Sequence, residues 1–226
     1  MGKPKVVVAE AIAPAGIVAM EVSCEVDVAV GVERAELLAR LDDAAGLIVR
    51  SATQVDAEMM AAAPHLQVVG RAGVGVDNID LEAATRAGVL VVNAPNANTI
   101  SAAEHTMALL LAQARRIAEA DASLRSGAWE RKRFSGVELY GRTLGVVGLG
   151  RIGTLVAQRA SAFGMRILAY DPYVSEERAR RLGVELGGLA EVFATADFLT
   201  IHLPRTKDTE GLVDAEMLGT MKPTAR

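Results

Sequence analysis

Three glycines between a predicted strand and a predicted helix form the first group of residues that could do chemistry. The segment VVGLGRIG spans residues 146–153 and has the spacing G-x-G-x-x-G. Gly148 permits a tight turn, Gly150 lets the backbone approach a pyrophosphate, and Gly153 lets the helix pack closely on the sheet. The first amides of such a helix face the anion. The pattern therefore predicts a dinucleotide site.

An acidic residue closes the next strand. Residues 166–170 form an apolar run that ends at Asp171. A carboxylate in this position accepts hydrogen bonds from ribose hydroxyls and repels a 2′-phosphate, so it favours NAD over NADP. Pro172 and Tyr173 follow and offer no partner for a phosphate. The alternative is that Asp171 caps a helix that begins near Ser175.

A second group of polar residues follows two strands in the first part of the chain. Arg50 and a serine come directly after one predicted strand, and residues 71–78, RAGVGVDN, follow the next. Open parallel sheets bind ligands at these strand ends, where a guanidinium, a hydroxyl and glycine-loop amides can hold a carboxylate or a phosphate. The alternative is that the arginines form ion pairs with Asp56 or Asp77, and that the glycines only make turns.

Histidine is the usual proton donor or acceptor near neutral pH, and the chain has three. His65 follows a proline in a connector, and His105 lies near the start of a long predicted helix. His202 closes a strand that flanks the cofactor rather than the reacting carbon, so we expect it to serve packing. We expect no metal site, because no cluster of metal-ligand residues is present. Hydride transfer with a nicotinamide is the chemistry that these residues serve best.

The elements that position these residues alternate between strands and helices. Residues 1–98 are expected to form a substrate domain with a doubly wound, flavodoxin-like parallel sheet, because Val-rich runs alternate with Ala/Leu/Glu-rich stretches. The predicted strands span residues 5–10, 25–30, 46–50, 66–70 and 89–92, and the predicted helices span residues 14–21, 33–42, 56–63 and 80–87.

Residues 99–226 are expected to form a second α/β domain, a Rossmann domain that binds NAD. A helical pattern over residues 99–119 opens it, with Ser101 and Glu104 placed as a capping box. The polar stretch 121–142 packs either on its own domain or against a second subunit. The remaining predicted elements are strands at 144–148, 166–170, 184–186 and 197–203, and helices at 152–163, 175–182 and 189–195.

These strands match only the first part of the Rossmann order 3-2-1-4-5-6. We therefore expect an incomplete second domain, with strand 197–203 at an exposed edge. The chain is expected to be a fragment of a longer polypeptide, or a shortened chain that needs a partner.

The composition is that of a globular protein, with 51% hydrophobic and 23% charged residues. A net charge of −4 argues against nucleic acid as a partner, although residues 131–133 form a short basic run. A single cysteine, Cys24, excludes a disulfide within the chain and favours the cytoplasm. We expect no membrane partner, because no apolar stretch approaches the ~20 residues of a membrane span.

Together these motifs resemble those of the D-isomer-specific 2-hydroxyacid dehydrogenases. The segments that carry the resemblance are 50–53 (RSAT), 71–78, 93–95 (NAP), 101–104 (SAAE), 148–153 and 170–172 (YDP). The resemblance implies NAD-dependent oxidation of 3-phospho-D-glycerate to 3-phosphohydroxypyruvate, the first step of serine biosynthesis. The alternatives are another D-2-hydroxy acid, such as glycerate or glyoxylate, or a non-enzymatic, NAD-responsive protein of the corepressor type.

The resemblance also implies roles for residues by position. On the substrate side it places Arg50, Ser51, Val74, Gly75 and Asn98. Against the cofactor it places Val74, Gly148, Gly150, Arg151, Ile152, Gly153, Asp171, Leu203 and Pro204. The catalytic arginine, glutamate and histidine of the family would lie beyond Arg226, so we expect no catalytic residue in this chain. A homo-oligomer that pairs through the nucleotide domain is also implied.

Overall fold

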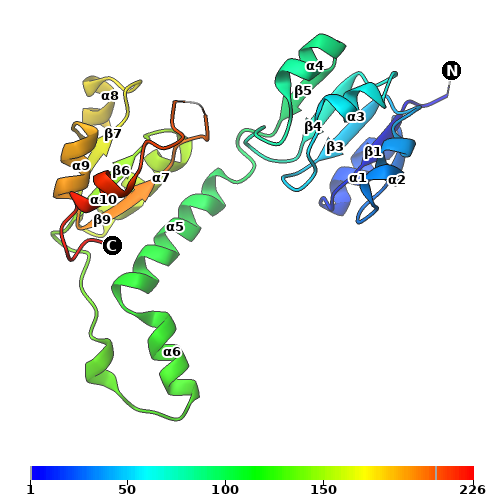
Figure 1. Ribbon diagram of the computed structural model, residues 1–226. Coiled ribbons are helices and arrows are strands. Elements are labelled where there is room, and N and C mark those ends of the chain that lie inside the picture. The colour runs from blue at the N-terminus through cyan, green and yellow to red at the C-terminus, as the bar shows by residue number, and fades with distance from the viewer. Residues whose placement is uncertain (1, 207) are drawn as a thin grey trace. The chain divides into compact units, whose positions relative to one another are not determined.

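A computed structural model describes residues 2–206 and 208–226 (Figure 1). The chain divides into two compact units, Met1–Asn98 and Thr99–Arg226. Each unit has a parallel sheet of its own, with helices in the connections between strands.

The first unit has a five-stranded parallel sheet with the order β2-β1-β3-β4-β5. This is the flavodoxin order, as predicted. The strands are β1 (Lys5–Val8), β2 (Glu25–Val28), β3 (Gly46–Val49), β4 (Val68–Arg71) and β5 (Leu90–Asn93), and the helices are α1 (Pro14–Glu21), α2 (Arg34–Arg40), α3 (Ala57–Ala61) and α4 (Leu81–Ala87). The first three strands end earlier than predicted, because the residues after them already belong to loops at the carboxyl edge of the sheet.

The core of the first unit joins the central strands to α2, α3 and α4. Val7, Leu47 and Val69 are fully buried and belong to the same cluster as Leu41 and Met59. Helix α1 contributes no buried residue. The hydrophobic core therefore packs α2, α3 and α4 against the central strands and fixes these strands. Their carboxyl ends carry the predicted anion-binding loops.

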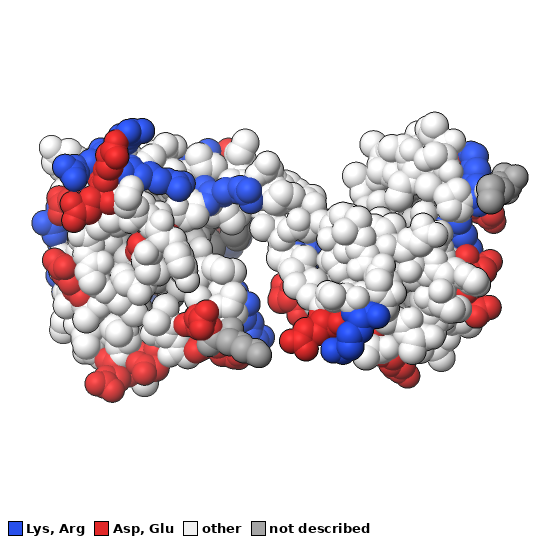
Figure 2. Space-filling model, turned by 90° about the horizontal axis from the view of Figure 1, so that it is seen from above, with Lys and Arg blue, Asp and Glu red and all other residues white. Residues whose placement is uncertain are grey.

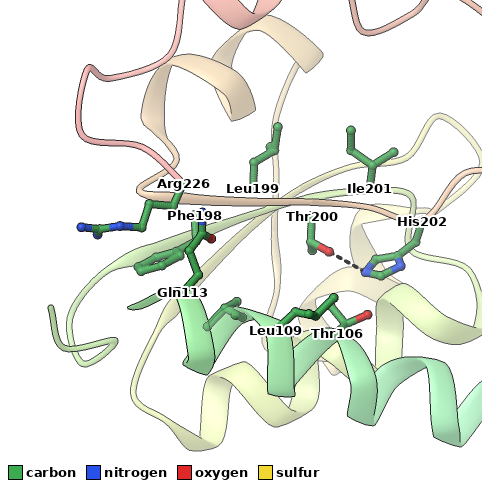
Figure 3. Close-up of a pocket in the computed structure, with 10 residues that line it drawn as sticks. Thr106, Leu109, Gln113, Phe198, Leu199, Thr200, Ile201, His202 and Arg226 are labelled. Atoms are coloured by element: carbon green, nitrogen blue, oxygen red, sulfur yellow. Dashed lines mark hydrogen bonds between the residues drawn. The ribbon is translucent and has the colours of Figure 1, made fainter. Parts of the chain in front are cut away.

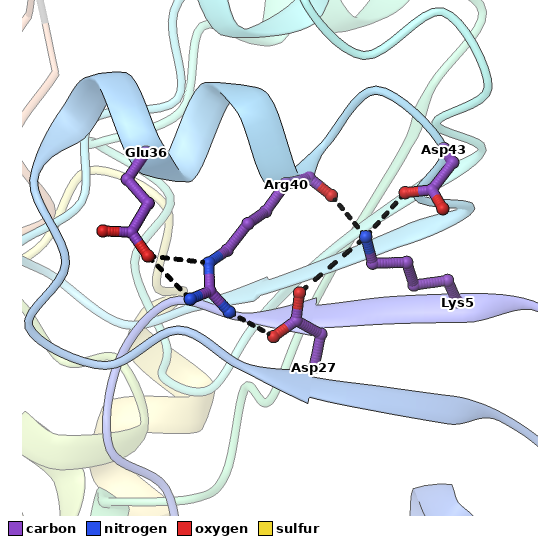
Figure 4. A network of polar contacts seen from close by, with 5 residues as sticks. All are labelled: Lys5, Asp27, Glu36, Arg40 and Asp43. Carbon is purple, nitrogen blue, oxygen red and sulfur yellow. Dashed lines mark hydrogen bonds and ion pairs between the residues drawn. The ribbon is translucent and has the colours of Figure 1, made fainter.

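An ionic network ties α2 to the first two strands (Figure 4). Arg40 donates to Asp27 on β2 at 2.6 Å and to Glu36 one turn earlier at 2.6 Å. Lys5 donates to Asp43 at 2.6 Å and to the carbonyl oxygen of Arg40 at 2.9 Å. Partly exposed pairs of this kind stabilise a fold by about 1 kcal/mol or less each. Because Lys5 begins β1, the network acts at the amino end of that strand.

The second unit has a four-stranded parallel sheet with the order β8-β7-β6-β9. This is the 3-2-1-4 part of the Rossmann order, which confirms the predicted fold class. The strands are β6 (Thr143–Val147), β7 (Arg166–Tyr170), β8 (Glu185–Leu186) and β9 (Phe198–Ile201), and the helices are α5 (Thr99–Ala114), α6 (Ile117–Arg125), the 3-10 helix η1 (Arg131–Phe134), α7 (Arg151–Ala162), α8 (Glu176–Arg181), α9 (Leu189–Thr195) and α10 (Ala215–Gly219).

The predicted capping box of the long helix is wrong. Helix α5 begins at Thr99, so Ser101 lies inside its first turn and cannot be its N-cap. The two residues of the proposed box are therefore both helical. Asn96, Asn98 and Thr99 precede residue 101 and offer competing helix starts, which the sequence pattern alone did not separate.

The predicted helix 99–119 is also too long. It breaks after Ala114, and Arg116 adopts the left-handed region with φ 54° before α6 begins. The Nη1 atom of Arg116 donates to the carbonyl oxygen of Arg133 at 2.9 Å, and its guanidinium lies 5.5 Å from the centre of the Phe134 ring. Contacts with residues distant in sequence thus hold a conformation that helical periodicity cannot reveal.

Strand β9 lies at one edge of the second sheet, but its amino end is paired. The amide of Arg226 donates to the carbonyl oxygen of Asp197 at 3.0 Å, and the amide of Leu199 donates to the carbonyl oxygen of Arg226 at 2.9 Å. These two bonds form the pattern of a parallel bridge. The predicted exposed edge is therefore covered at its start and open at its end, where Ile201 is 47% exposed.

Basic and acidic side chains are mixed on the surface. On the face that Figure 2 shows, Lys and Arg lie close to Asp and Glu on both units. Arg125 and Arg180 each pair with an acidic residue one turn earlier, Asp121 and Glu176. No described helix combines the length and the apolar character needed to cross a membrane.

Candidate functional site

The predicted glycine turn joins β6 to α7. Gly148 has φ 98°, a region that favours glycine, and a Cβ atom there would lie 2.8 Å from the carbonyl oxygen of His202. A Cβ atom on Gly153 would overlap the carbonyl oxygen of Gly148. Gly148 is therefore required by its backbone conformation, and Gly153 is required because the helix and the turn approach each other closely.

Gly150 differs from its two neighbours. Its φ is −67°, which any residue can adopt, and a Cβ atom there would meet nothing within 4 Å. The packing of the chain therefore does not demand glycine at this position. Gly150 is the N-cap of α7, and the first amides of a helix have no partner within the helix. The open space in front of Gly150 thus lies where an anion is favoured.

Asp171 turns back from the end of β7 toward the glycine turn. Its Oδ2 accepts a hydrogen bond from the amide of Leu149 at 2.7 Å, and its Oδ1 accepts one from the amide of Tyr173 at 2.9 Å. Each oxygen keeps a lone pair for a further donor, such as a ribose hydroxyl. The alternative role as a helix cap is wrong, because Ser175 caps α8 by accepting from the amide of Arg178.

The segment after β9 reaches the same turn. The amide of His202 donates to the carbonyl oxygen of Val147 at 2.8 Å. The side chain of Leu203 lies 3.0 Å from where a Cβ atom on Gly148 would stand, whereas Pro204 is exposed. The second unit therefore brings the glycine turn, Asp171 and Leu203 together.

The side chain of His202 lines a cavity of about 480 Å³ between β9 and α5 (Figure 3). Its Nε2 lies 2.9 Å from the hydroxyl of Thr200, and burial lowers the pKa of the imidazole. No carboxylate in the described part of the chain bonds to it. An imidazole whose charged form is disfavoured by burial, and which bonds to no carboxylate of the described residues, fits packing better than proton transfer. Helix α5 and strand β9 contribute further residues to the lining of this cavity: Thr106, Leu109, Leu110, Gln113, Phe198, Leu199, Thr200 and Ile201.

In the first unit, a carboxylate holds the loop that follows β3. The Oε1 atom of Glu10 accepts hydrogen bonds from the amides of Arg50 at 2.8 Å and Thr53 at 2.9 Å, and its Oε2 accepts one from Ala52 at 3.2 Å. Burial raises the pKa of Glu10, whereas the hydrogen bonds from these amides lower it. The hydrogen bonds have the larger combined effect, so the pKa lies below its usual value. Three loop amides are therefore occupied and not free to bind an anionic ligand.

The side chains of Arg50 and Ser51 are exposed. Arg50 reaches the carbonyl oxygen of Ala11 at 3.4 Å and forms no ion pair with another described residue. The ion-pair alternative is wrong for Asp56, which pairs with Arg34 at 2.8 Å and caps α3. The loop after β3 thus offers a guanidinium and a hydroxyl that other parts of the first unit leave open to a ligand.

The loop after β4 wraps around the side chain of Arg71. The Nε atom of Arg71 donates to the carbonyl oxygen of Arg50 at 3.2 Å, and a Cβ atom on Gly73 would overlap the guanidinium. Val74 is half-buried, and its carbonyl oxygen accepts from the Nδ2 of Asn93 at 2.6 Å. Gly75 is exposed beside it. The two predicted loops are therefore in direct contact, joined by a hydrogen bond.

The sequence analysis missed Glu10, and it included Asn78 in the segment 71–78 without giving that residue a role of its own. Asn78 is 4% exposed, and its Nδ2 donates to the carbonyl oxygens of Arg50 at 2.9 Å and Thr53 at 2.6 Å. Glu10 follows β1, and strand-end position was the signal that could have found it. Asn98, placed on the substrate side by resemblance, is exposed and ends the first unit.

No group of three or more potential metal ligands gathers within residues 2–206 and 208–226.

Known proteins are similar to this chain in sequence and in fold. Residues 107–226 match the family model of the D-isomer specific 2-hydroxyacid dehydrogenase, NAD binding domain. The chain is 56% identical over 223 residues to D-3-phosphoglycerate dehydrogenase of Mycobacterium tuberculosis, and 51% identical over 219 residues to that of Archaeoglobus fulgidus. These matches cover 99% and 96% of the chain but 42% of each relative, so the chain spans less than half of their length.

Solved structures are similar across both units. The TT0316 protein from Thermus thermophilus superposes with a TM-score of 0.88 at 39% identity, covering 96% of this chain and 70% of that one. D-Lactate dehydrogenase from Aquifex aeolicus, complexed with NAD and lactic acid, superposes with a TM-score of 0.86 at 27% identity, covering 96% and 66%. On its sequence, its fold and the residues gathered at its glycine turn, the chain belongs to the D-isomer-specific 2-hydroxyacid dehydrogenases.

Proposed function

We propose that the protein takes part in the NAD-dependent oxidation of 3-phospho-D-glycerate at its 2-hydroxyl, which gives 3-phosphohydroxypyruvate. The observation that carries the proposal is the open face of Gly150, beside a carboxylate at Asp171 that keeps lone pairs for ribose hydroxyls. Similarity to D-3-phosphoglycerate dehydrogenases over 99% of the chain supports the choice of substrate.

The residues of the second unit fit a dinucleotide. We assign the pyrophosphate to the start of α7, which begins at Arg151 after its N-cap Gly150, against Gly150 and the backbone of Arg151 and Ile152. Asp171 holds the ribose hydroxyls, and Leu203 with Pro204 lines the adenosine side. When bound, NAD supplies the hydride acceptor, and the protein binds and orients it.

The residues of the first unit fit an anionic substrate. The exposed side chains of Arg50 and Ser51 bind its carboxylate or phosphate, because three amides of their loop already bond to Glu10. Val74 and Gly75 lie on the neighbouring loop that contacts this one. We assign the backbone of this second loop, with Asn98, to the same substrate side.

We further propose that the protein works in the cytoplasm as a homo-oligomer that pairs through its second unit. Helices α6 and η1 contribute no buried residue, and Trp129 between them is 75% exposed. A large exposed aromatic side chain of this kind is typical of a surface that a partner covers.

The test measures binding of 3-phosphoglycerate by titration calorimetry in the presence of NAD. Replacing Arg50 with Met removes the guanidinium and is expected to weaken binding about tenfold or more, as charge-assisted hydrogen bonds predict. Arg86→Met is the matched control, because Arg86 is an exposed arginine of the same unit on α4. Unchanged binding by the Arg50 variant contradicts the proposed site. Binding of unphosphorylated glycerate with equal affinity would favour a different D-2-hydroxy acid.

A further inference from the structure

Glu10 anchors the donor side of the loop 50–53. Its carboxylate accepts from the amides of Arg50, Ala52 and Thr53 at 2.8, 3.2 and 2.9 Å. Hydrogen bonds to an ionised acceptor are about twice as strong as those between neutral groups. Glu10 lies 40 residues before Arg50, at the end of another strand, so it fixes the loop to β1 as well as to β3.

Asn78 anchors the acceptor side of the same loop. Its Nδ2 donates to the carbonyl oxygens of Arg50 and Thr53, and its own Oδ1 is buried without a partner among the described residues. The reverse orientation of the amide would set its oxygen against two carbonyl oxygens, so this orientation is fixed. The side chain thus serves the loop and leaves its own acceptor unsatisfied.

We propose that Glu10 and Asn78 are positioning residues that hold the loop 50–53 in its binding conformation and present Arg50 and Ser51 to an anionic substrate. The inference rests on the proposed function, because it takes this loop to be the substrate side. Neither residue touches the substrate. They lower the loss of loop freedom on binding, which is the general benefit of preorganisation.

A purely structural role would be a weaker explanation of these contacts. The two anchors converge on the same two loop residues, Arg50 and Thr53, from the ends of two different segments of the unit. They leave the side chain of Arg50 exposed, with one long contact of 3.4 Å to a backbone oxygen. The contacts thus fix the backbone of the loop and leave the guanidinium of Arg50 exposed to a ligand.

The experiment replaces Glu10 with Gln and with Ala. Gln keeps one oxygen in place of Oε1, which bonds to Arg50 and Thr53, whereas Ala removes all three bonds. The matched control is Glu21→Ala, an exposed glutamate on α1 whose carboxylate has no hydrogen bond among the described residues. Asn78→Asp tests the other anchor with nearly the same shape and without its two donors.

Two readouts are measured on each variant. Amide hydrogen exchange at Arg50, Ala52 and Thr53 is expected to accelerate about tenfold in Glu10→Ala, with a smaller effect in Glu10→Gln. The affinity for 3-phosphoglycerate is expected to fall about tenfold in Glu10→Ala, while the affinity for NAD, which is placed in the other unit, stays unchanged. Glu21→Ala is expected to change neither readout.

Each contrary result has a distinct meaning. If Arg50→Met weakens 3-phosphoglycerate binding but Glu10→Ala does not, despite faster exchange, the inference is overturned and the proposed function stands. If exchange at the three amides stays slow, or if Glu10→Ala weakens NAD binding as much as 3-phosphoglycerate binding, the positioning role is also overturned. If Arg50→Met binds 3-phosphoglycerate normally, the proposed function itself fails. Glu10→Gln keeps the test valid should the other variants not fold.

Discussion

At the scale of single residues, Gly150 and Gly153 belong to the same glycine motif, and the structure gives a different reason for glycine at each position. A Cβ atom on Gly150 meets open space, whereas one on Gly153 overlaps a backbone oxygen. We expect Gly150→Ala to keep the free energy of unfolding of the parent chain in urea denaturation. It should bind NAD about tenfold more weakly, because its methyl group would occupy the space that we propose for the pyrophosphate. Gly153→Ala should lose about 1–3 kcal/mol of stability. Normal NAD binding by Gly150→Ala would place the pyrophosphate elsewhere.

The choice between NAD and NADP is expected to depend on the charge of Asp171. Asp171→Asn keeps the shape of the side chain but removes the charge that repels a 2′-phosphate. We expect NAD affinity to fall about tenfold and the preference for NAD over NADP to narrow, measured by titration calorimetry with both cofactors. Asp121→Asn is the control, since it removes the same charge from an exposed position on α6. An unchanged preference would exclude Asp171 as the ribose acceptor.

These residues differ in how far sequence alone predicts them. The glycine spacing and Asp171 are local signals, because the turn and the strand that it follows lie within one βαβ unit. Glu10 and Asn78 are not predictable in this way. Their bonds to the loop 50–53 span 40 and 28 residues at Arg50, so only the folded sheet brings them together.

At the scale of elements, the bonds between Glu10 and the loop 50–53 make the stability of the first unit depend on pH. The pKa of Glu10 is lowered in the folded protein, because the loop amides outweigh the effect of burial. A carboxyl group of this kind stabilises the fold above its unfolded pKa, about 4.3 for Glu, and that contribution is lost as the pH falls through the folded pKa. The pKa values of Asp56 and Asp197 are also lowered and add to the same loss.

We therefore expect the free energy of unfolding to decrease below about pH 4, measured by urea denaturation between pH 7 and pH 3. Glu10→Gln cannot titrate at this position, so its stability should decrease less steeply over the same range. Parallel curves for the two proteins would show that Glu10 does not contribute.

Most strands and helices were predicted from periodicity, but several of their boundaries were not, and the long helix is the clearest case. The helical pattern predicts a single helix over 99–119, whereas α5 ends at Ala114 and α6 begins at Ile117. The break at Arg116 depends on the backbone of Arg133 and the ring of Phe134, which lie in a separate segment. The helix propensity of the sequence does not fall at Arg116, but tertiary contacts override that propensity.

At the scale of the whole molecule, the alternation of strands and helices, together with the glycine motif of the second unit, predicted both sheet orders. Parallel neighbours require crossover connections, which restrict the arrangements that such a pattern can adopt. The pairing of Arg226 with β9 was not predicted. Its two hydrogen bonds join backbone atoms, and the guanidinium of Arg226 lies 5.8 Å from the centre of the Phe198 ring, a contact between residues that are 28 positions apart. Sequence therefore described the order of the strands better than the state of the sheet edge.

Each unit has its own hydrophobic core, so we expect two separate transitions in calorimetric unfolding. Val7 and Met59 belong to the core of the first unit, whereas Val146 and Val156 belong to that of the second. NAD at about 100 times its Kd should stabilise the second unit by about 2.7 kcal/mol and leave the first transition in place. Met59→Ala should lower the first transition alone, with a loss of about 2–5 kcal/mol. A single transition that NAD shifts as a whole would mean that the two units unfold together, and that NAD binding stabilises the chain as one cooperative structure.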